Sequence, residues 1–369
     1  MISRRSLLQV GATTATSALI PRFALAQSAA SLVGAAKAAG QDRVVIASGS
    51  GDFGEVMDEL FFQPFTKETG ISVIAVDGSG PDATARFQAM IQLNKMEWDI
   101  VYLSRELALS SDFKPHFEDL GKSCQEMPNV GADGSAGSCV EGVAVAWDQG
   151  GTVLTYDERE FPKGGPSNWV EFWDLKAFPG PRALPNYGSP WYLLNGALLA
   201  DGVPREKLFP LDLDRAFKKL DEIKPHVAVW WTSGDQSQQV FRNGEVVASP
   251  MWNGRASRLQ EEGIPVRFTW DGANYQAQTY GITKGAPSLL AAKALLNFMY
   301  TNPEAHAAFM RKMFYAVPNK NALALLDPKF AATLVISSDN LSKVVKVDPD
   351  WLSANRDKVL ERWSTWIIG

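Results

Sequence analysis

Histidine, cysteine and long apolar stretches are all scarce in this sequence. Its 369 residues include only three histidines and two cysteines. Because no carboxylate–histidine cluster accompanies them, a metal-handling function is not expected. The absence of any G-x-S-x-G motif argues against an exported hydrolase of the serine type. Beyond the N-terminal segment, no stretch is long and apolar enough to cross a bilayer.

The N-terminal segment has the features of an export signal. Arg4 and Arg5 form a twin arginine, a mildly apolar stretch follows, and Ala24-Leu25-Ala26 gives an A-x-A cleavage pattern. Serine, threonine and glycine dilute the apolar stretch, which makes it too polar to remain as a spanning helix. We therefore predict a twin-arginine signal over residues 1–26 and a periplasmic location. An ordinary secretory signal is the alternative.

The balance of charge excludes some partners. Three arginines leave with the signal, so the mature chain has 33 basic and 41 acidic residues, a formal charge of −8. Nucleic acids and anionic membrane surfaces are therefore not expected as partners. The 343 residues that follow position 26 exceed what one hydrophobic core normally holds, which predicts two lobes.

The two cysteines lie close together in the chain. Cys124 and Cys139 flank a polar, glycine-rich segment. In an oxidising compartment such an isolated pair predicts one structural disulfide. Zinc is a poor alternative, because His116, His226 and His306 have no ligand spacing to the pair.

Strand and helix patterns alternate along most of the chain. Apolar runs typical of buried strands occur at 43–48, 71–78 and 98–104, and helical patterns at 54–70 and 82–96 lie between them. This order predicts parallel strands covered by helices on both faces. Two extended runs at 140–160, broken by Gly150-Gly151, are suited to a crossing between lobes. A second unit of helices and short strands follows, including a helix over 189–202 with Ser189 as its predicted N-cap.

The first strand leads into a possible cofactor motif. Gly49, Gly51 and Gly54 spell G-x-G-x-x-G before a helical pattern, and Asp77 ends the next strand-like run. This is the outline of a dinucleotide fingerprint, in which glycines let the backbone approach a pyrophosphate. An exported NAD(P)-dependent oxidoreductase therefore stands as the alternative function.

Several longer segments together indicate a family. They are PFTKETGISV, WDIVYLS, NGEVVASPMWNG, TYGITKGAPSLLAAKALLNFMYTNPEAHAAF and AVPNKNAL. In this order and spacing, the chain resembles the periplasmic solute-binding proteins of ABC importers, and the spermidine/putrescine-type branch in particular. The likeness extends over nearly the whole mature chain.

The resemblance implies an α/β fold of two lobes. Each lobe would have a mixed, mostly parallel sheet flanked by helices, and crossing strands would act as a hinge. Lobe one is expected at 27–142 plus 275–320, and lobe two at 143–274 plus 321–369. Such a protein is not an enzyme and needs no cofactor or metal. It would act as a monomer that closes over a small solute and delivers it to permease subunits in the inner membrane.

The resemblance also places residues in the solute site. Polyamine-binding members set aromatic rings along the methylene chain and acidic side chains against the ammonium groups. The aromatic part is present here as Phe53, Trp252 and tyrosines near other loop ends. The acidic part is mostly replaced, because Ser189, Tyr192 and Gln278 stand at the family's acidic positions.

Charged residues point to a different solute. Glu106, Asp52 and Asp235 are possible substitutes for the missing acids. Arg255 and Arg105, with a helix N-terminus at Ser189, are typical of carboxylate binding. A polyamine-like or small amino-carboxylate solute is therefore expected. The predicted ligand-binding residues are Ser50, Asp52, Phe53, Arg105, Glu106, Tyr187, Ser189, Tyr192, Ser233, Trp252, Arg255, Tyr275 and Gln278.

Overall fold

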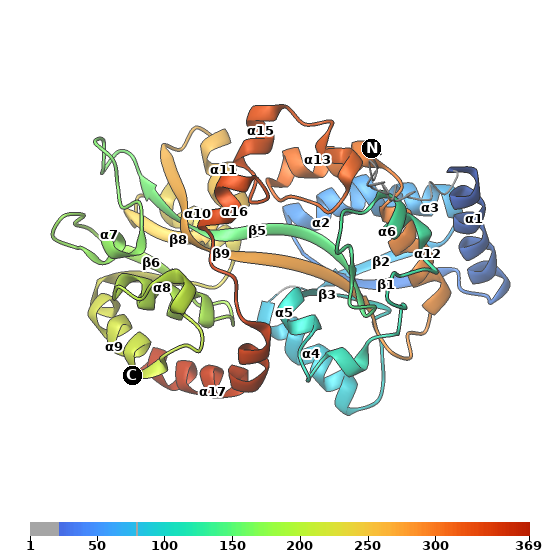
Figure 1. Cartoon of the computed structure of the whole chain (residues 1–369), viewed down its shortest axis with the longest axis horizontal. Coiled ribbons are helices and arrows are strands. Elements are labelled where there is room, and N and C mark those ends of the chain that lie inside the picture. The colour runs from blue at the N-terminus through green and yellow to red at the C-terminus, as the bar shows by residue number, and fades with distance from the viewer. Residues whose placement is uncertain (1–21, 79) are drawn as a thin grey trace, which may run out of the picture.

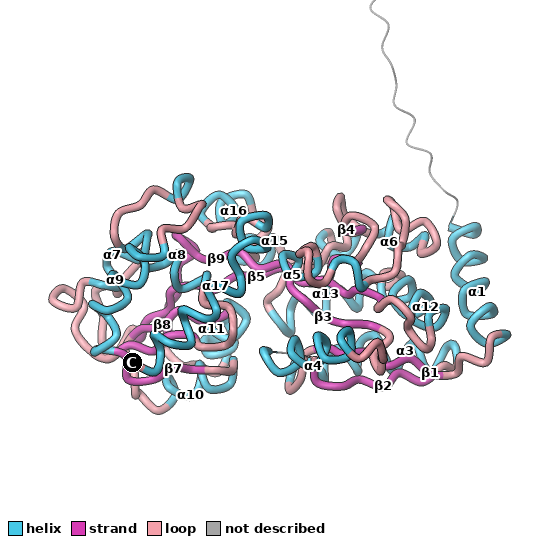
Figure 2. Tube along the Cα trace, turned by 90° about the horizontal axis from the view of Figure 1, so that it is seen from below, coloured by secondary structure: helices cyan, strands magenta, loops and turns pink. Residues whose placement is uncertain are grey.

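The computed structural model describes residues 22–78 and 80–369. Nine strands form one hydrogen-bonded sheet in the order β2-β1-β3-β9-β5-β8-β6-β7, and β4 pairs with β5 beside that path. Helices lie on both sides of the strands, and the ribbon divides into two lobes (Figures 1 and 2). The expected two-lobed α/β fold is confirmed.

The first half of the sheet consists of β1 (Arg43–Ser48), β2 (Ser72–Asp77) and β3 (Ile100–Ser104), all parallel. Its helices are α1 (Arg22–Ala38), α2 (Asp52–Met57), the π-helical turn η1 (Asp58–Phe62), α3 (Gln63–Thr69), α4 (Gly80–Gln92), α5 (Arg105–Ala108), α6 (Pro128–Asp133), α12 (Leu289–Met299) and α13 (Pro303–Met313).

The second half consists of β6 (Arg182–Pro185), β7 (Val227–Trp231) and β8 (Ala248–Trp252), with β6 parallel to both neighbours. Its helices are α7 (Trp169–Trp173), α8 (Trp191–Ala200), α9 (Leu213–Ile223), α10 (Gly234–Arg242) and α11 (Asn253–Glu261). Short 3₁₀ turns occupy Lys114–His116, Arg205–Lys207 and Lys224–His226. The C-terminal helices are α14 (Lys320–Leu323), α15 (Pro328–Thr333), α16 (Ser338–Lys343) and α17 (Pro349–Ile368).

Two long antiparallel strands join the halves. β5 (Ala144–Asp157) and β9 (Val266–Ile282) pair along most of their length, and the two-residue β4 (Cys139–Val140) extends the start of β5. The last residues of β9 pair with β3, whereas the last residues of β5 pair with β8. Each half of the sheet is thus attached to an opposite end of the same strand pair (Figure 1).

The sequence patterns mislead at Gly150 and Gly151. They predicted two extended runs separated at these glycines, but β5 continues through both residues as one strand. Register shifts against β9 lie on either side, between Ala146 and Gln149 and between Thr152 and Leu154. The neighbouring strand leaves no room for a side chain here, because a Cβ at Gly151 would lie 2.9 Å from the Asn274 carbonyl oxygen. Close packing of strands, rather than a turn, therefore requires these residues.

The helical segment after the first strand follows its prediction closely. Residues 52–69 are helical throughout, and Gly70 ends the segment in the left-handed conformation with φ 73°. Phe61, Phe62 and Phe65 are fully buried in the first core. This face of three phenylalanines is what fixes the helix against the sheet.

Two features of the fold were not predicted. Helix α1 packs against α12, and the predicted cleavage point after Ala26 falls inside α1. Arg4 and Arg5 lie outside the described residues. Helix α17 contacts both halves: Trp363 donates to Asn186 at 2.9 Å, and the Ser353 and Ser111 hydroxyls are 3.1 Å apart (Figure 1). A third connection between the halves therefore accompanies β5 and β9.

The exact lobe boundaries stay a prediction. Those at 274 and 320 fall within β9 and α14, and β5 and β9 belong to both halves of the sheet. In the described ranges, no helix combines the length and apolar character that a membrane span requires.

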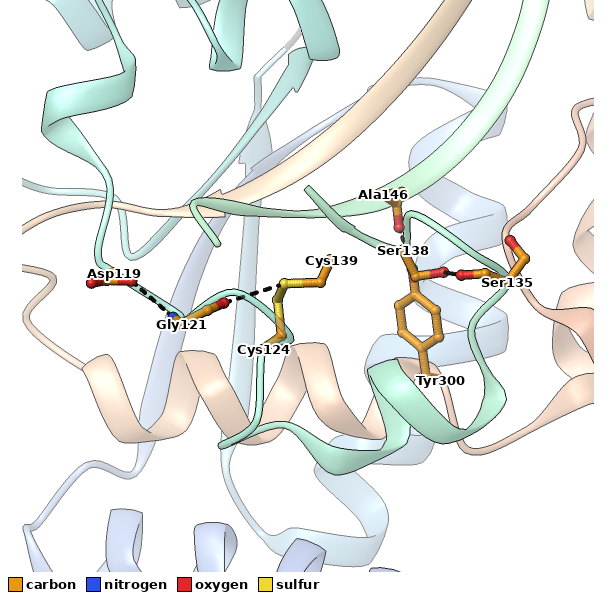
Figure 3. The surroundings of a disulfide bond; sticks show 8 residues. All are labelled: Asp119, Gly121, Cys124, Ser135, Ser138, Cys139, Ala146 and Tyr300. Carbon is orange, nitrogen blue, oxygen red and sulfur yellow. Dashed lines mark hydrogen bonds between the residues drawn. A yellow bond between two sulfur atoms is a disulfide. The ribbon is translucent and has the colours of Figure 1, made fainter. Parts of the chain in front are cut away.

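The predicted disulfide between Cys124 and Cys139 is present (Figure 3). Their Cα atoms are 5.7 Å apart, and the Cys139 sulfur lies 3.5 Å from the Gly121 carbonyl oxygen. The Ser138 hydroxyl beside it donates to the carbonyl oxygens of Ser135 and Pro318. The disulfide therefore holds a loop that also packs on the segment after α13.

Removing this disulfide should destabilise the fold without changing its architecture. The double variant Cys124→Ser/Cys139→Ser should lose about 3 kcal/mol of unfolding free energy, because the unfolded chain regains the entropy of a 15-residue loop. Urea denaturation with and without a reducing agent measures this. The reductant should lower the midpoint of the parent chain and leave that of the double variant unchanged. Equal midpoints for oxidised parent and variant would contradict the prediction.

Candidate functional site

Loops from both halves meet at the middle of the paired strands β5 and β9. Strands β1 and β3 end where α2 and α5 begin, and β7 and β8 end where α10 and α11 begin. Ligands of open α/β sheets bind beyond the carboxyl ends of parallel strands. One ion pair crosses between these ends, since the Arg255 guanidinium on α11 lies 3.8 Å from Asp52 on α2.

An aromatic cluster forms the second-half side of this site. The Tyr187 ring lies 5.1 Å from Trp252 and is stacked on Trp231 at 5.2 Å. Its hydroxyl accepts a hydrogen bond of 3.1 Å from the Gln276 amide of β9. The structure thus brings together two predicted residues, Tyr187 and Trp252, and adds Trp231.

A second aromatic cluster lies on the first half. The Tyr102 ring of β3 lies 5.5 Å from Phe53 and 5.2 Å from Tyr280. Phe53 also packs edge-on against Phe309 of α13, and only 8% of it is exposed. Phe53 therefore supports Tyr102 from the core side, and Tyr102 is the more accessible of the two rings.

The principal cation of the site is Arg255. Its guanidinium lies 3.0 Å from Asp235 and 3.8 Å from Asp52, and its side chain is 15% exposed. Gly234 makes room for it, because a Cβ there would lie 2.5 Å from the Arg255 Nε. Ser233 caps α10 by accepting from the Gln236 amide. Arg255 therefore lies beside the N-terminus of α10.

The expected cap at Ser189 is wrong. Helix α8 begins at Trp191, its N-cap is Pro190, and no side chain caps its first turn. The Pro190 backbone is already helical, and the Tyr192 amide donates to the Ser189 carbonyl oxygen instead of to a side chain. The helix start that accompanies Arg255 is that of α10.

Two carboxyl groups lie near the strand pair. Glu106 follows β3, and its buried Oε2 accepts no hydrogen bond from the described residues. Burial raises the pKa of its carboxyl above the usual value, although the Glu106 amide, the Ser104 hydroxyl and the Arg105 charge oppose the shift. Asp148 of β5 accepts a 2.6 Å hydrogen bond from the Tyr102 hydroxyl. Burial raises the pKa of Asp148 to about 7.

The charge of Glu106 affects the pKa values of two tyrosines. Burial raises the pKa of Tyr275 to about 12, and the charge of Glu106 contributes to that shift. Burial also raises the pKa of Tyr192, and Glu106 again adds to the effect. The Tyr275 hydroxyl donates to the Gln149 side chain at 2.7 Å. The charge of Glu106 therefore acts on Tyr192 and Tyr275, both predicted site residues.

The remaining predicted residues are placed less centrally. Ser50 and Ser233 are exposed in the turns before α2 and α10. Arg105 opens the short helix α5, and its charge reaches Tyr275. Gln278 pairs with Ser104 across β3 and β9. Of the thirteen residues, the structure brings Arg255 into contact with Asp52 and Asp235, and Tyr187 into contact with Trp252.

Sequence reasoning missed four residues at this site. They are Tyr102, Asp148, Trp231 and Tyr315. A signal for Tyr315 existed in the glycines: a Cβ at Gly150 or Gly254 would lie 2.6 or 2.7 Å from its ring. No comparable signal marks Asp148, which lies in an apolar strand pattern without a motif.

The glycines of the possible dinucleotide fingerprint have contacts of their own. A Cβ at Gly49 would lie 2.4 Å from the Phe53 ring, and one at Gly54 would lie 2.9 Å from the Gly49 carbonyl oxygen. Gly51 has φ 59°. The turn therefore needs glycine to pack α2 on β1, whether or not an anion binds there.

Within the described ranges, no group of three or more His, Cys, Asp or Glu residues is placed to hold a metal ion. Two cavities of about 410 and 400 Å³ lie elsewhere on the second half. The first is beside the Arg205–Asp271 ion pair, and the second is beside residues 225–228.

Comparison with known proteins gives a consistent result. Residues 61–334 match the family described as bacterial extracellular solute-binding proteins. The chain is 30% identical over 338 residues to a gamma-aminobutyric acid-binding protein of Pseudomonas aeruginosa, covering 90% of this chain and 92% of that one. A spermidine/putrescine-binding periplasmic protein of Salmonella typhimurium is 27% identical over 124 residues, which are 33% of this chain and 35% of that one. The nicotinamide-dependent alternative receives no support from these relatives.

Solved structures extend the comparison to the arrangement of the halves. The AttC protein of Agrobacterium tumefaciens C58, open and unliganded, is 38% identical with a TM-score of 0.66 over 88% of this chain and 99% of that one. The AgtB protein of A. tumefaciens R10, in complex with agropinic acid, is 28% identical with a TM-score of 0.76 over 89% and 99%.

Substitution of Gly54 tests whether packing explains the glycine pattern. Gly54→Ala should lower the unfolding free energy by about 1–3 kcal/mol, because its Cβ would press on the Gly49 carbonyl oxygen. Gly34→Ala is the matched control, since Gly34 lies in α1 with open space around it. The control should gain up to about 1 kcal/mol from helix propensity. Chemical denaturation measures both, and a Gly54→Ala protein as stable as its parent would refute the packing explanation.

Proposed function

This chain belongs to the bacterial extracellular solute-binding proteins, and we propose that its solute is a small amino-carboxylate of the γ-aminobutyrate type. It is a solute-binding protein rather than an enzyme. Proteins of this kind bind small molecules and work with the membrane permeases of ABC importers. The observation that carries the proposal is an arginine after the strands of one half, together with a buried carboxyl oxygen after a strand of the other half that has no partner among the described residues.

The acidic end of such a solute would meet Arg255. A guanidinium presents a planar fork of donors that matches a carboxylate. Its present partners, Asp235 and Asp52, are 76% and 61% exposed, and exposed pairs of this kind contribute little stability. A solute carboxylate beside the N-terminus of α10 can therefore displace them at small cost.

The ammonium end would meet Glu106. Its Oε2 is buried and has no donor among the described residues, and such a group gains most from a partner that supplies both a proton donor and a positive charge. Tyr192 and Tyr275, whose pKa values burial and the charge of Glu106 raise, would cover the methylene groups. The similarity to the gamma-aminobutyric acid-binding protein of P. aeruginosa supports the same class of solute.

A polyamine fits the same residues less well. It has an ammonium at each end, so one of them would approach the Arg255 guanidinium, and like charges repel. The resemblance puts Ser189, Tyr192 and Gln278 at or near the positions where polyamine-binding members carry acids. The polyamine-like solute expected from the resemblance is therefore the second choice.

The cellular setting belongs to the same proposal. We infer that residues 1–26 direct export by the twin-arginine route, and that the mature protein acts as a monomer in the periplasm. Closure of the two halves over the solute would present a surface made by both of them to the permease. The hinge would be β5 and β9, because they alone among the described strands are shared by both halves of the sheet.

A thermal-shift panel tests the class of solute. Ligand that binds only the folded protein adds about 2.7 kcal/mol of stability at a hundredfold excess over Kd. γ-Aminobutyrate and 5-aminovalerate should raise the melting temperature strongly, γ-hydroxybutyrate less, and putrescine least. A larger shift with putrescine than with either amino acid would favour a polyamine as the solute and contradict the proposal of an amino-carboxylate.

Substitutions on α11 test the role of Arg255. Arg255→Ala should weaken binding of γ-aminobutyrate at least tenfold, because the solute carboxylate loses its partner. Arg258→Ala is the matched control, because Arg258 lies on the same helix. Its guanidinium donates to Glu261 and to the Lys312 carbonyl oxygen instead of to Asp235 and Asp52. Isothermal titration should find the control within twofold of the parent. An Arg255→Ala protein that binds as tightly as the control would rule out this carboxylate contact.

A further inference from the structure

Asp148 is a buried carboxyl group in the strand that joins the two halves. It lies where the register of β5 against β9 shifts, and only 4% of it is exposed. The hydroxyl of Tyr102 and its own backbone amide hydrogen-bond to its carboxyl. A carboxylate has about four acceptor positions, so these two donors leave part of its capacity unused.

No basic side chain of the described residues forms an ion pair with Asp148. Every ion pair of that part of the chain involves other acids, and Arg255, the cation of the site, pairs with Asp235 and Asp52. A buried carboxylate without a cation is costly, so it is either neutral or partnered by a bound ligand. The fold therefore buries at its centre a carboxyl group that can become a carboxylate when a cationic ligand binds beside it.

The groups around Asp148 come from every element that faces it. Tyr102 lies on β3, Tyr275 and Tyr280 on β9, and Tyr315 follows α13, and the charge of Asp148 raises the pKa of each. Glu106 acts on Tyr275 and Arg255 acts on Tyr315. The strand registers place Asp148 and the end of β3 at the same level of the sheet, because Gln149 pairs with Ala277 and Ser104 pairs with Gln278.

We propose that Asp148 is a specificity-determining residue that binds the ammonium group of the solute together with Glu106. This rests on the proposed function, because it takes the solute to be an amino-carboxylate. An ammonium has three donors and can meet both carboxyl groups around Tyr275. Tyr102 holds one oxygen of Asp148 in place, so it acts as a positioning residue. Solute binding then favours the charged carboxylate and releases the proton that the empty site holds.

The pH dependence follows from the raised pKa of Asp148, which is about 7. Below pH 7 the empty site is protonated, so binding of an ammonium must first remove that proton. The affinity for γ-aminobutyrate should therefore fall as the pH drops from 8 to 6, by up to tenfold per unit below the pKa. At pH 7, titrations in two buffers of different ionisation enthalpy should reveal release of about half a proton.

Asp148→Asn is the decisive variant, because its side-chain oxygen still accepts from the Tyr102 hydroxyl. We expect it to bind γ-aminobutyrate at least tenfold more weakly at pH 8, with little dependence on pH and no proton release. Binding of γ-hydroxybutyrate, which lacks the ammonium, should stay within twofold. Tyr102→Phe should shift the pH midpoint of γ-aminobutyrate binding upward, since it removes the donor that favours the charged form.

A measurement without solute checks that the variant is folded. The parent protein loses stability as the pH rises from about 4, the pKa of Asp148 in the unfolded chain, to about 7, its pKa in the folded protein, because the charged form is disfavoured by burial. The melting temperature of Asp148→Asn minus that of the parent should therefore increase from pH 5 to pH 8. Equal loss of both solutes in this variant would indicate a structural role and overturn the inference.

Two further outcomes separate the inference from the proposed function. A parent protein that binds γ-aminobutyrate, with Asp148→Asn matching its affinity and pH profile, overturns the role of Asp148 alone. A parent protein that binds neither γ-aminobutyrate nor 5-aminovalerate overturns the proposed function, and the inference with it.

Discussion

The antiparallel pairing of β5 with β9 holds the two halves of this protein together. Their backbone hydrogen bonds run through the centre of the sheet, and β3 and β8 attach at opposite ends of the pair. The register near Gln149 and Thr152 is irregular, so the ladder is already interrupted where the proposed hinge would bend. Helix α17 adds a contact across the halves from outside the sheet.

The same strand pair also positions the charges of the site. Asp148 lies on β5, and Tyr275 and Gln276 lie on β9. Arg255 on α11 pairs with Asp235 and Asp52. The proposed solute has one charge of each sign, and these residues would offer it both a carboxyl group and a guanidinium.

Local sequence patterns predicted most of the elements and part of the site. Strand β1, the helical segment closed by Gly70 and the Cys124–Cys139 disulfide all follow from residues near one another in the chain. Trp252 and Arg255 were predicted from the WNG segment of the resemblance and the helix that follows it, and Glu106 from its place directly after the third strand. Ser189 was misjudged, since Pro190 takes the cap position that its side chain was expected to fill.

The sequence by itself determined the alternation of elements, the two-lobed family and the chemical types available to a site. Only the tertiary structure decided that Asp148 lies beneath Tyr102 and that Arg255 lies between Asp235 and Asp52. The reason is physical: helix and strand patterns depend on neighbours a few positions apart. The contact of Tyr102 with Asp148 joins residues 46 positions apart, and it exists only once β3, β9 and β5 have paired.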